Sequence, residues 1–445
     1  MIKVAGFAVT AVLALVHTAA AAECEIPRNM TKEQKEPCVR GASLMRDQPT
    51  LTMEQLGNGP DFNGGDPSNE FLYFTAEDNP TCYFRPHYAF KAVKGKSLKF
   101  QCWQLAADRH LLDEKGQPIA ITDIKVVLEE NSGGENRAHL YAKTDTTNQN
   151  EIDADRFKVK YLKPPHPEHD RRFNEVFTEL AAGRILWALG FPADHVYPVN
   201  SVNCVGCTAS PFESNLEQNN AALTAAPSVF RMVTVERDIP WSEIDPENDE
   251  TWSWQDVAQY YANGTWTQQQ KIEYDAYRLA LGLFNYHNAI DVQNRVACAE
   301  FKPGVSNPRI CTKPYIFVQD LGSTFGKPKG FIFGTNPRGD FAAWQSQTVF
   351  KNASSCELRA HLDGDRKVLK AALDIVIERA KSLDRTRVRE IFKVARFDLM
   401  DQKQLKKIRE TESDEAKVRE IALDQWTDLF MQRIAELSTA QNCKS

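Results

Sequence analysis

The stretch YIFVQDLGSTFG, residues 315–326, places an acidic residue at the end of an apolar strand. The first residues suit a buried strand, and Asp320 is followed at once by Leu321 and Gly322. A carboxylate at the end of such a strand is costly to bury unless it has a partner. Two interpretations are open: Asp320 is a ligand for a cation, or it is an aspartate that begins a glycine-containing turn.

Length and composition restrict the class of protein. The chain has 445 residues, of which 42% are hydrophobic and 26% charged, and its net charge is −6. This is enough chain for a large core and more than one lobe, and the composition is that of a globular protein. A nucleic-acid-binding protein usually shows a basic excess, so we expect no nucleic-acid partner.

The chain begins with MIKVAGFAVTAVLALVHTAAAAEC, in which a lysine precedes an apolar run and three alanines. This order predicts a secretory signal peptide over residues 1–22, since the apolar run is too short to span a membrane. The alternative is a buried N-terminal helix. We expect a periplasmic or secreted protein with no transmembrane segment after signal removal.

The chain contains ten cysteines, an even number that favours disulfides in an oxidising compartment. The spacings do not fix the connectivity. Pairing of nearest neighbours gives 24–38, 82–102, 204–207 and 298–311, which leaves 356–443. A zinc site at Cys204 and Cys207 needs two more ligands, and no second CxxC or paired histidine is present, so we expect no structural metal.

The order of the predicted elements divides the chain. Residues 23–68 are a polar lead-in, interpreted as loop or weakly ordered chain. Residues 69–200 contain strands, a hairpin over 121–143 and one helix over 173–191. Residues 201–445 are mainly helical, with helices predicted over 253–262, 270–284, 367–383, 385–395 and 416–437 and a short hairpin over 295–320. This order predicts an α+β protein with a small sheet lobe and a larger helical lobe.

Four features occur in a fixed order along the chain. Lys160 lies in an alternating strand, and Glu175 and Glu179 share one face of the next helix. A polar loop, FNYHNAIDVQNRVAC, precedes the strand that ends at Asp320. This order resembles the two-lobed protein-kinase-like fold, in which a strand lysine, a helix glutamate, a catalytic loop and a metal-binding aspartate follow one another.

The D-x-G-x-x-F-G run is more similar to secretory-pathway and lipid-kinase-like relatives than to ordinary protein kinases. The segments WALGFPADHVYPV, the CxxC after it and QDLGSTFG resemble a bacterial secreted family with this architecture, over roughly residues 80–445. The resemblance implies ATP with Mg²⁺ or Mn²⁺ as cofactors.

The resemblance also implies roles for individual residues. Lys160 would hold the phosphates, Glu179 would be its partner and Asp320 would bind the metal. The hairpin tip Gly133–Gly134 would cover the phosphates, although two glycines at a tip are also an ordinary turn. For Lys160 the alternative is a lysine on an exposed strand face, in step with Arg156 and Lys158. For Glu179 the alternatives are an exposed helix face and the rival partner Glu175.

The catalytic loop departs from the kinase pattern. Asn288 stands where the catalytic aspartate is expected, and Ile290 replaces a helper lysine. Gln293 and Asn294 are the candidates for the second metal ligand. Asp291 and His287 are the remaining candidates for a base, whose loss typically costs ~10²–10⁴-fold in rate.

Three hypotheses follow. The favoured one is an exported pseudokinase or weak nucleotide-binding module that acts in the cell envelope. The second is an active secreted phosphotransferase that uses ATP and a divalent metal. The third is an exported scaffold or binding protein without a nucleotide site. The protein or small molecule that would be its partner is not identified by the sequence.

Overall fold

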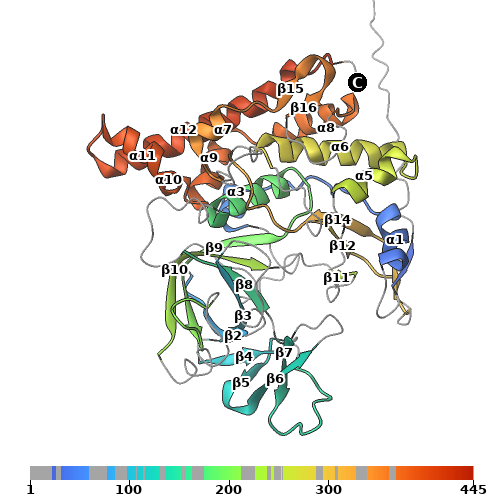
Figure 1. The fold of residues 1–445 in the computed structure, drawn as a ribbon, viewed down its shortest axis with the longest axis vertical. Coiled ribbons are helices and arrows are strands. Elements are labelled where there is room, and N and C mark those ends of the chain that lie inside the picture. Colours follow the sequence, from blue (N-terminus) through green and yellow to red (C-terminus); the bar gives the residue numbers. More distant parts are fainter. Residues whose placement is uncertain are drawn as a thin grey trace, which may run out of the picture.

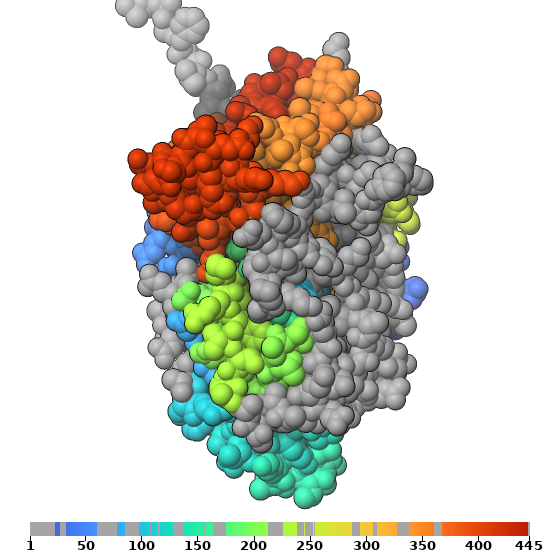
Figure 2. All heavy atoms as spheres, turned by 60° about the vertical axis from the view of Figure 1, so that its left-hand side comes forward, coloured from blue at the N-terminus to red at the C-terminus, as the bar shows by residue number. Residues whose placement is uncertain are grey.

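The computed structural model describes residues 23–26, 32–59, 78–85, 98–106, 108–113, 116–130, 136–152, 154, 156–162, 175–211, 226–237, 242–244, 252, 254–286, 294–305, 309–326, 338–359 and 367–443. The signal-peptide prediction over residues 1–22 falls outside these residues. The protein has a mixed α and β structure, with most of the strands towards one end of the molecule and most of the helices towards the other (Figure 1). Figure 2 shows the hairpin strands near residues 120–142 at the end opposite the C-terminal helices.

Five strands form a closed ring of hydrogen-bonded neighbours. The ring order is β2-β9-β10-β8-β3, and β3 pairs back to β2. Only the β2–β9 pair in this ring is parallel. The sheet lobe predicted from the sequence is therefore a five-stranded barrel, composed of β2 (Thr81–Arg85), β3 (Lys99–Leu105), β8 (Arg156–Lys160), β9 (His195–Val205) and β10 (Ser228–Arg237).

Two short strands extend the barrel and a hairpin lies beyond it. β4 (His110–Leu112) and β5 (Pro118–Ala120) continue the sheet from β3. A short 3₁₀ helix, η2 (Ile121–Asp123), leads into β6 (Ile124–Glu130), which pairs antiparallel with β7 (Asn136–Ala142). The hairpin predicted over residues 121–143 is confirmed, while its tip, Gly133–Gly134, lies outside the described residues.

Helix α3 (Glu175–Ala188) lies between the barrel and the other helices (Figure 1). Apart from Trp187, every residue of this helix is buried. Apolar residues occur on every side of α3, so it must be covered on every side, which explains its central position. The two glutamates on α3 are therefore held inside the protein.

The remaining helices confirm the helical second half. Thr267 caps α6 by accepting from the Gln270 N–H, while the Gln270 side chain accepts from the Thr267 N–H. The helices are α5 (Trp254–Ala262), α6 (Gln268–Leu283), α7 (Phe341–Gln345), α8 (Lys370–Ala380), α9 (Arg385–Val394), α10 (Phe397–Met400), α11 (Gln402–Arg409) and α12 (Glu415–Thr439).

Three small sheets involve strands from this half of the chain. β11 (Ser242–Glu243), β12 (Asn294–Cys298) and β14 (Pro314–Val318) form a three-stranded sheet, which confirms the short hairpin predicted over 295–320. β13 (Arg309–Cys311) pairs with the N-terminal strand β1 (Cys24–Ile26). β15 (Phe350–Asn352) and β16 (Glu357–Leu358) pair across the 3₁₀ helix η4 (Ala353–Ser355).

The prediction of a loose lead-in was wrong for much of residues 23–59. Besides β1, this segment forms α1 (Lys32–Gly41) and α2 (Met53–Asn58). The Leu44 N–H donates to Glu273 Oε2 on α6 at 3.0 Å, and Leu44 and Leu56 are fully buried. The segment appears polar in the sequence because its helices are short and rich in polar residues. A few buried apolar residues nevertheless attach it to the core.

The predicted disulfide pairs are all confirmed. The bonds are Cys24–Cys38, Cys82–Cys102, Cys204–Cys207, Cys298–Cys311 and Cys356–Cys443, and no cysteine is free. Within the described ranges, no helix is both long enough and apolar enough to cross a membrane.

Candidate functional site

Lys160 is the last residue of β8 and its side chain is only 3% exposed. Its Nζ lies 2.5 Å from Glu179 Oε2 and 3.0 Å from Glu236 Oε2. The interpretation of Lys160 as a surface lysine in step with Arg156 is therefore wrong: Arg156 is exposed, whereas Lys160 is buried. A buried lysine between two carboxylates is a fixed positive charge in the interior.

The two glutamates of α3 have different partners. Glu179 faces Lys160, and the Leu321 N–H donates to Glu179 Oε1 at 3.4 Å. Glu175, one turn earlier, forms an ion pair with Arg338. The sequence left open whether Glu175 or Glu179 is the partner of Lys160. In the structure the ion-pair partner is Glu179.

Glu236 on β10 belongs to the same cluster, although sequence reasoning did not identify it. It contacts Lys158 as well as Lys160, and Glu236 and Lys158 are register partners across β10 and β8. A glutamate inside the strand-like run SVFRMVTVER was the available signal. Its partner could not be named from the sequence, because strand register is fixed only in the folded sheet.

Asp320 lies two residues beyond the end of β14. The Gly322 N–H donates to Asp320 Oδ1 at 3.0 Å, which is the contact of an aspartate that begins a turn. Burial opposes ionisation of Asp320, but the positive charges of Lys160, Lys99 and Arg338 and the Gly322 N–H together lower its pKa. The carboxylate is therefore ionised and has a second oxygen for a further ligand.

Lys99 brings a second positive charge to Asp320 from the neighbouring strand. Lys99 on β3 and Lys160 on β8 are direct register partners. Cross-strand partners share a face of the sheet, so both lysines project from the same face. Both contribute to the positive charge at Asp320, which is suited to an anion such as phosphate or to a metal–phosphate pair.

The acids of the cluster differ in their affinity for protons. Burial raises the pKa of Glu179 to about 8 against the opposing charge of Lys160, and the negative charges of Glu236, Asp320 and Glu175 add to the rise. Burial acts in the same direction on Glu236, but Lys158 and Lys160 lower its pKa to about 2. Desolvation disfavours the charge on Lys160, yet its acidic neighbours raise its pKa well above the usual value. Lys160 is thus charged, and Glu179 is the acid of the cluster whose pKa is raised.

Gly322 is required by a close approach of α3. A Cβ atom at this position would lie 2.0 Å from Glu175 Cγ. Thr178 Oγ1 donates to the Gly322 carbonyl at 2.9 Å, and Thr324 Oγ1 donates to the Leu321 carbonyl at 3.0 Å. The segment after Asp320 is therefore attached closely to α3, the helix that carries Glu179.

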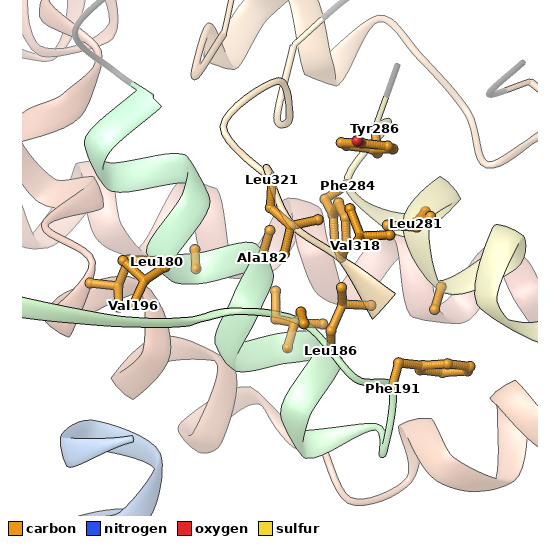
Figure 3. Close-up of a cluster of buried hydrophobic side chains, with 14 of the residues drawn as sticks. Leu180, Ala182, Leu186, Phe191, Val196, Leu281, Phe284, Tyr286, Val318 and Leu321 are labelled. Atoms are coloured by element: carbon orange, nitrogen blue, oxygen red, sulfur yellow. The ribbon is translucent and has the colours of Figure 1, made fainter. Parts of the chain in front are cut away.

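An apolar layer supports this segment from within. Figure 3 shows Leu321 near Ala182 of α3, and Val318 and Phe284 lie beside Leu321. Further along, Phe325 adopts φ +52° and its ring contacts an aromatic cluster formed by Phe284, Trp344, Phe392, Phe397 and Trp426. The left-handed backbone at Phe325 is unusual for a bulky residue and is maintained by these contacts. The run STFG thus anchors the Asp320 turn in the helical core.

Tyr286 and Asn294 are buried polar residues near this region. The Tyr286 hydroxyl has no hydrogen-bond partner among the described residues, and burial followed by the charge of Asp320 raises its pKa. Asn294 is the register partner of Val318. Neither the nitrogen nor the oxygen of its side-chain amide has a hydrogen-bond partner within the described part of the chain. The start of β12 therefore lies beside the end of β14, where Asp320 follows.

The other predicted catalytic and metal residues, His287, Asn288, Asp291 and Gln293, lie outside the described residues. A small cavity of about 10 Å³ occurs elsewhere, towards the C-terminal end of α3, lined by residues that include Arg184, Trp187 and His195. It has room for about one water molecule and does not include Lys160, Glu179 or Asp320.

Comparisons with known proteins give one distant structural similarity. No protein-family model matches the chain, and no curated protein matches its sequence. A solved structure, the Helicobacter pylori proinflammatory kinase CtkA, is 13% identical with a TM-score of 0.36, and the match covers 71% of this chain and 94% of that one. A TM-score at this level does not establish a common fold, so the interpretation of the site depends on its own contacts.

Proposed function

We propose that the protein has a kinase-like fold and binds a nucleoside triphosphate with a divalent metal at the cluster of Lys160, Glu179 and Asp320. The observation that carries the proposal is the buried contact between Lys160 and Glu179, 2.5 Å long, beside an ionised aspartate at a strand end. A lysine held by a helix glutamate neutralises phosphate charge, and an aspartate oxygen is a ligand that Mg²⁺ prefers.

The charges of the cluster support this assignment over a purely structural ion pair. Two lysines, Lys99 and Lys160, act on Asp320, and the pKa of Glu179 is raised. A divalent cation at Asp320 would lower the pKa of Glu179, since added positive charge lowers the pKa of a nearby acid.

Within this function we propose a pseudokinase, or a weak nucleotide-binding module, exported to the cell envelope. Asn288 in place of the expected catalytic aspartate supports the loss of activity, because an amide cannot accept the proton of an attacking hydroxyl. The five disulfides support an oxidising compartment. The alternative of an active phosphotransferase requires Asp291 or His287 to act as the base.

Calorimetric titration of the oxidised protein with ATP tests the proposal. The titration is run with Mg²⁺, with Mn²⁺ and with a chelator, on the wild type, Lys160→Met and the exposed-lysine control Lys313→Met. We expect metal-dependent binding in the wild type and the control, and at least about tenfold weaker binding in a folded Lys160→Met. Metal-independent binding, or equal binding in both variants, would contradict the site.

A turnover assay at saturating ATP separates the pseudokinase from the active alternative. The pseudokinase predicts that phosphate release does not exceed that of an Asp320→Asn variant. Turnover in the wild type that Asp320→Asn abolishes would instead establish an active phosphotransferase.

A further inference from the structure

Four cysteines from three distant parts of the sequence meet in the barrel. Cys82 on β2 and Cys204 on β9 are register partners across the parallel strand pair. Cys102 on β3 is bonded to Cys82, and Cys207 is bonded to Cys204. The Sγ atoms of Cys82, Cys102 and Cys204 all lie within 4.8 Å of one another, and Cys207 is outside this group but bonded to Cys204. All four cysteines are at most 3% exposed.

One distance between the two disulfides is close to that of sulfurs sharing one metal ion. Cys102 Sγ and Cys204 Sγ are 4.0 Å apart. With Zn–S bonds of about 2.3 Å, tetrahedral geometry separates two ligand sulfurs by about 3.8 Å. The Cα atoms within each disulfide are 5.5 Å apart. Two cysteine side chains that begin this close together can both reach one metal ion.

The local backbone at Cys204 and Cys207 also suits a metal. Two cysteines separated by two residues are a frequent zinc-ligand pair. Gly206 between them adopts φ +81°, which turns the chain so that both sulfurs face the same side. Cys82 and Cys102 then supply the two further ligands that the sequence alone did not reveal, because they lie more than a hundred residues away.

We propose that Cys82, Cys102, Cys204 and Cys207 form a redox-dependent zinc site. In the reduced protein four thiols bind one Zn²⁺ as thiolates and release four protons. In the oxidised protein the same sulfurs form the two disulfides and the ion is absent. An iron–sulfur cluster is less suited, because sulfurs this close together leave no room for several metal ions and bridging sulfides.

The conversion balances with a small-molecule disulfide as the oxidant. Two such disulfides accept four electrons from the four thiolates, two protein S–S bonds form and Zn²⁺ leaves. The oxidant becomes four thiolates, which take up four protons from solvent. A thiol reductant reverses the exchange through mixed disulfides.

The test uses the full chain, unfolded with a phosphine reductant and refolded with either Zn²⁺ or Co²⁺, then desalted. The cluster variant is Cys82→Ser/Cys204→Ser. The matched control is Cys24→Ser/Cys311→Ser, which also removes one cysteine from each of two disulfides and also affects a pair of cross-strand register partners. In the described residues these control cysteines are not part of a metal-like grouping.

We expect about one metal ion per chain in the reduced wild type and the control, and at least about tenfold less in the cluster variant, since two of four ligands are gone. Bound Co²⁺ should show the absorption of a tetrahedral thiolate site. Adding the small-molecule disulfide should release the metal and remove four hydrogens in total from the peptides that contain Cys82, Cys102, Cys204 and Cys207. Three outcomes would overturn the proposal: no metal retained, equal retention in both variants, or a reduced chain that does not refold with zinc.

Discussion

Replacing Lys160 by methionine removes a buried charge and little volume. In the wild type its Nζ lies 2.5 Å from Glu179 and 3.0 Å from Glu236, and all three side chains are almost completely buried. Removing one member of a buried ion pair costs about 3–5 kcal/mol, because the partner charges lose their compensation. We expect Lys160→Met to lower the free energy of unfolding by about this amount at neutral pH.

Lys313→Met is the matched control. Lys313 also forms an ion pair with a glutamate at 3.0 Å, but its side chain and that of Glu300 are 47% and 64% exposed. Exposed pairs contribute about 0–1 kcal/mol. The two variants therefore differ in burial rather than in the type of contact.

The assay is equilibrium unfolding of the oxidised protein in urea, followed by tryptophan fluorescence and by circular dichroism. Agreement of the two signals checks that a single transition is being measured. The double variant Lys160→Met/Glu179→Gln should recover part of the loss, with a coupling of about 0.5–3 kcal/mol. Equal destabilisation by Lys160→Met and Lys313→Met would refute the assignment of a buried ion-pair cluster.

Three further predictions concern the surroundings of the cluster. Burial raises the pKa of Glu179 from 4.5 to about 8, so its contribution to stability is complete below pH 4.5 and disappears as the pH rises through 8. Glu179→Gln should therefore flatten the decline of the melting temperature over this range, and unchanged slopes in a pH series of melting curves would contradict the shift. Gly322→Ala should cost about 1–3 kcal/mol in urea unfolding, since its Cβ would lie 2.0 Å from Glu175 Cγ. Gly57→Ala, with no contact closer than 3.6 Å, should cost nothing, and similar values for the two would argue against the close approach. Cys356→Ser/Cys443→Ser opens a link across 87 residues and should cost about 4–5 kcal/mol in the same assay, against about 3 kcal/mol for Cys298→Ser/Cys311→Ser across 13; the reverse order would contradict the chain-entropy explanation.

Local signals in the sequence predicted much of the fold. The apolar periodicity of residues 173–191 predicted α3, and the hairpin over 121–143 followed from its turn glycines. The nearest-neighbour cysteine pairs also proved correct. These features depend on residues close together in the chain, where spacing and turn chemistry are informative.

Contacts set by strand register could not be predicted in the same way. Glu236 reaches Lys160 because β10 pairs with β8 in one register, and Lys99 joins because β3 pairs on the other side. The four-cysteine cluster likewise depends on the β2–β9 pairing.

The most direct measurement of the central claim is the thermal unfolding of the oxidised protein with and without ATP and Mg²⁺, beside Asp320→Asn and the exposed control Asp374→Asn. A ligand at a hundred times its dissociation constant stabilises by about 2.7 kcal/mol, or a few degrees in melting temperature for a chain of this length. The account predicts a metal-dependent rise in the wild type and in Asp374→Asn that is absent in Asp320→Asn. No rise in any of them, or the same rise in all, would contradict a nucleotide site at Asp320.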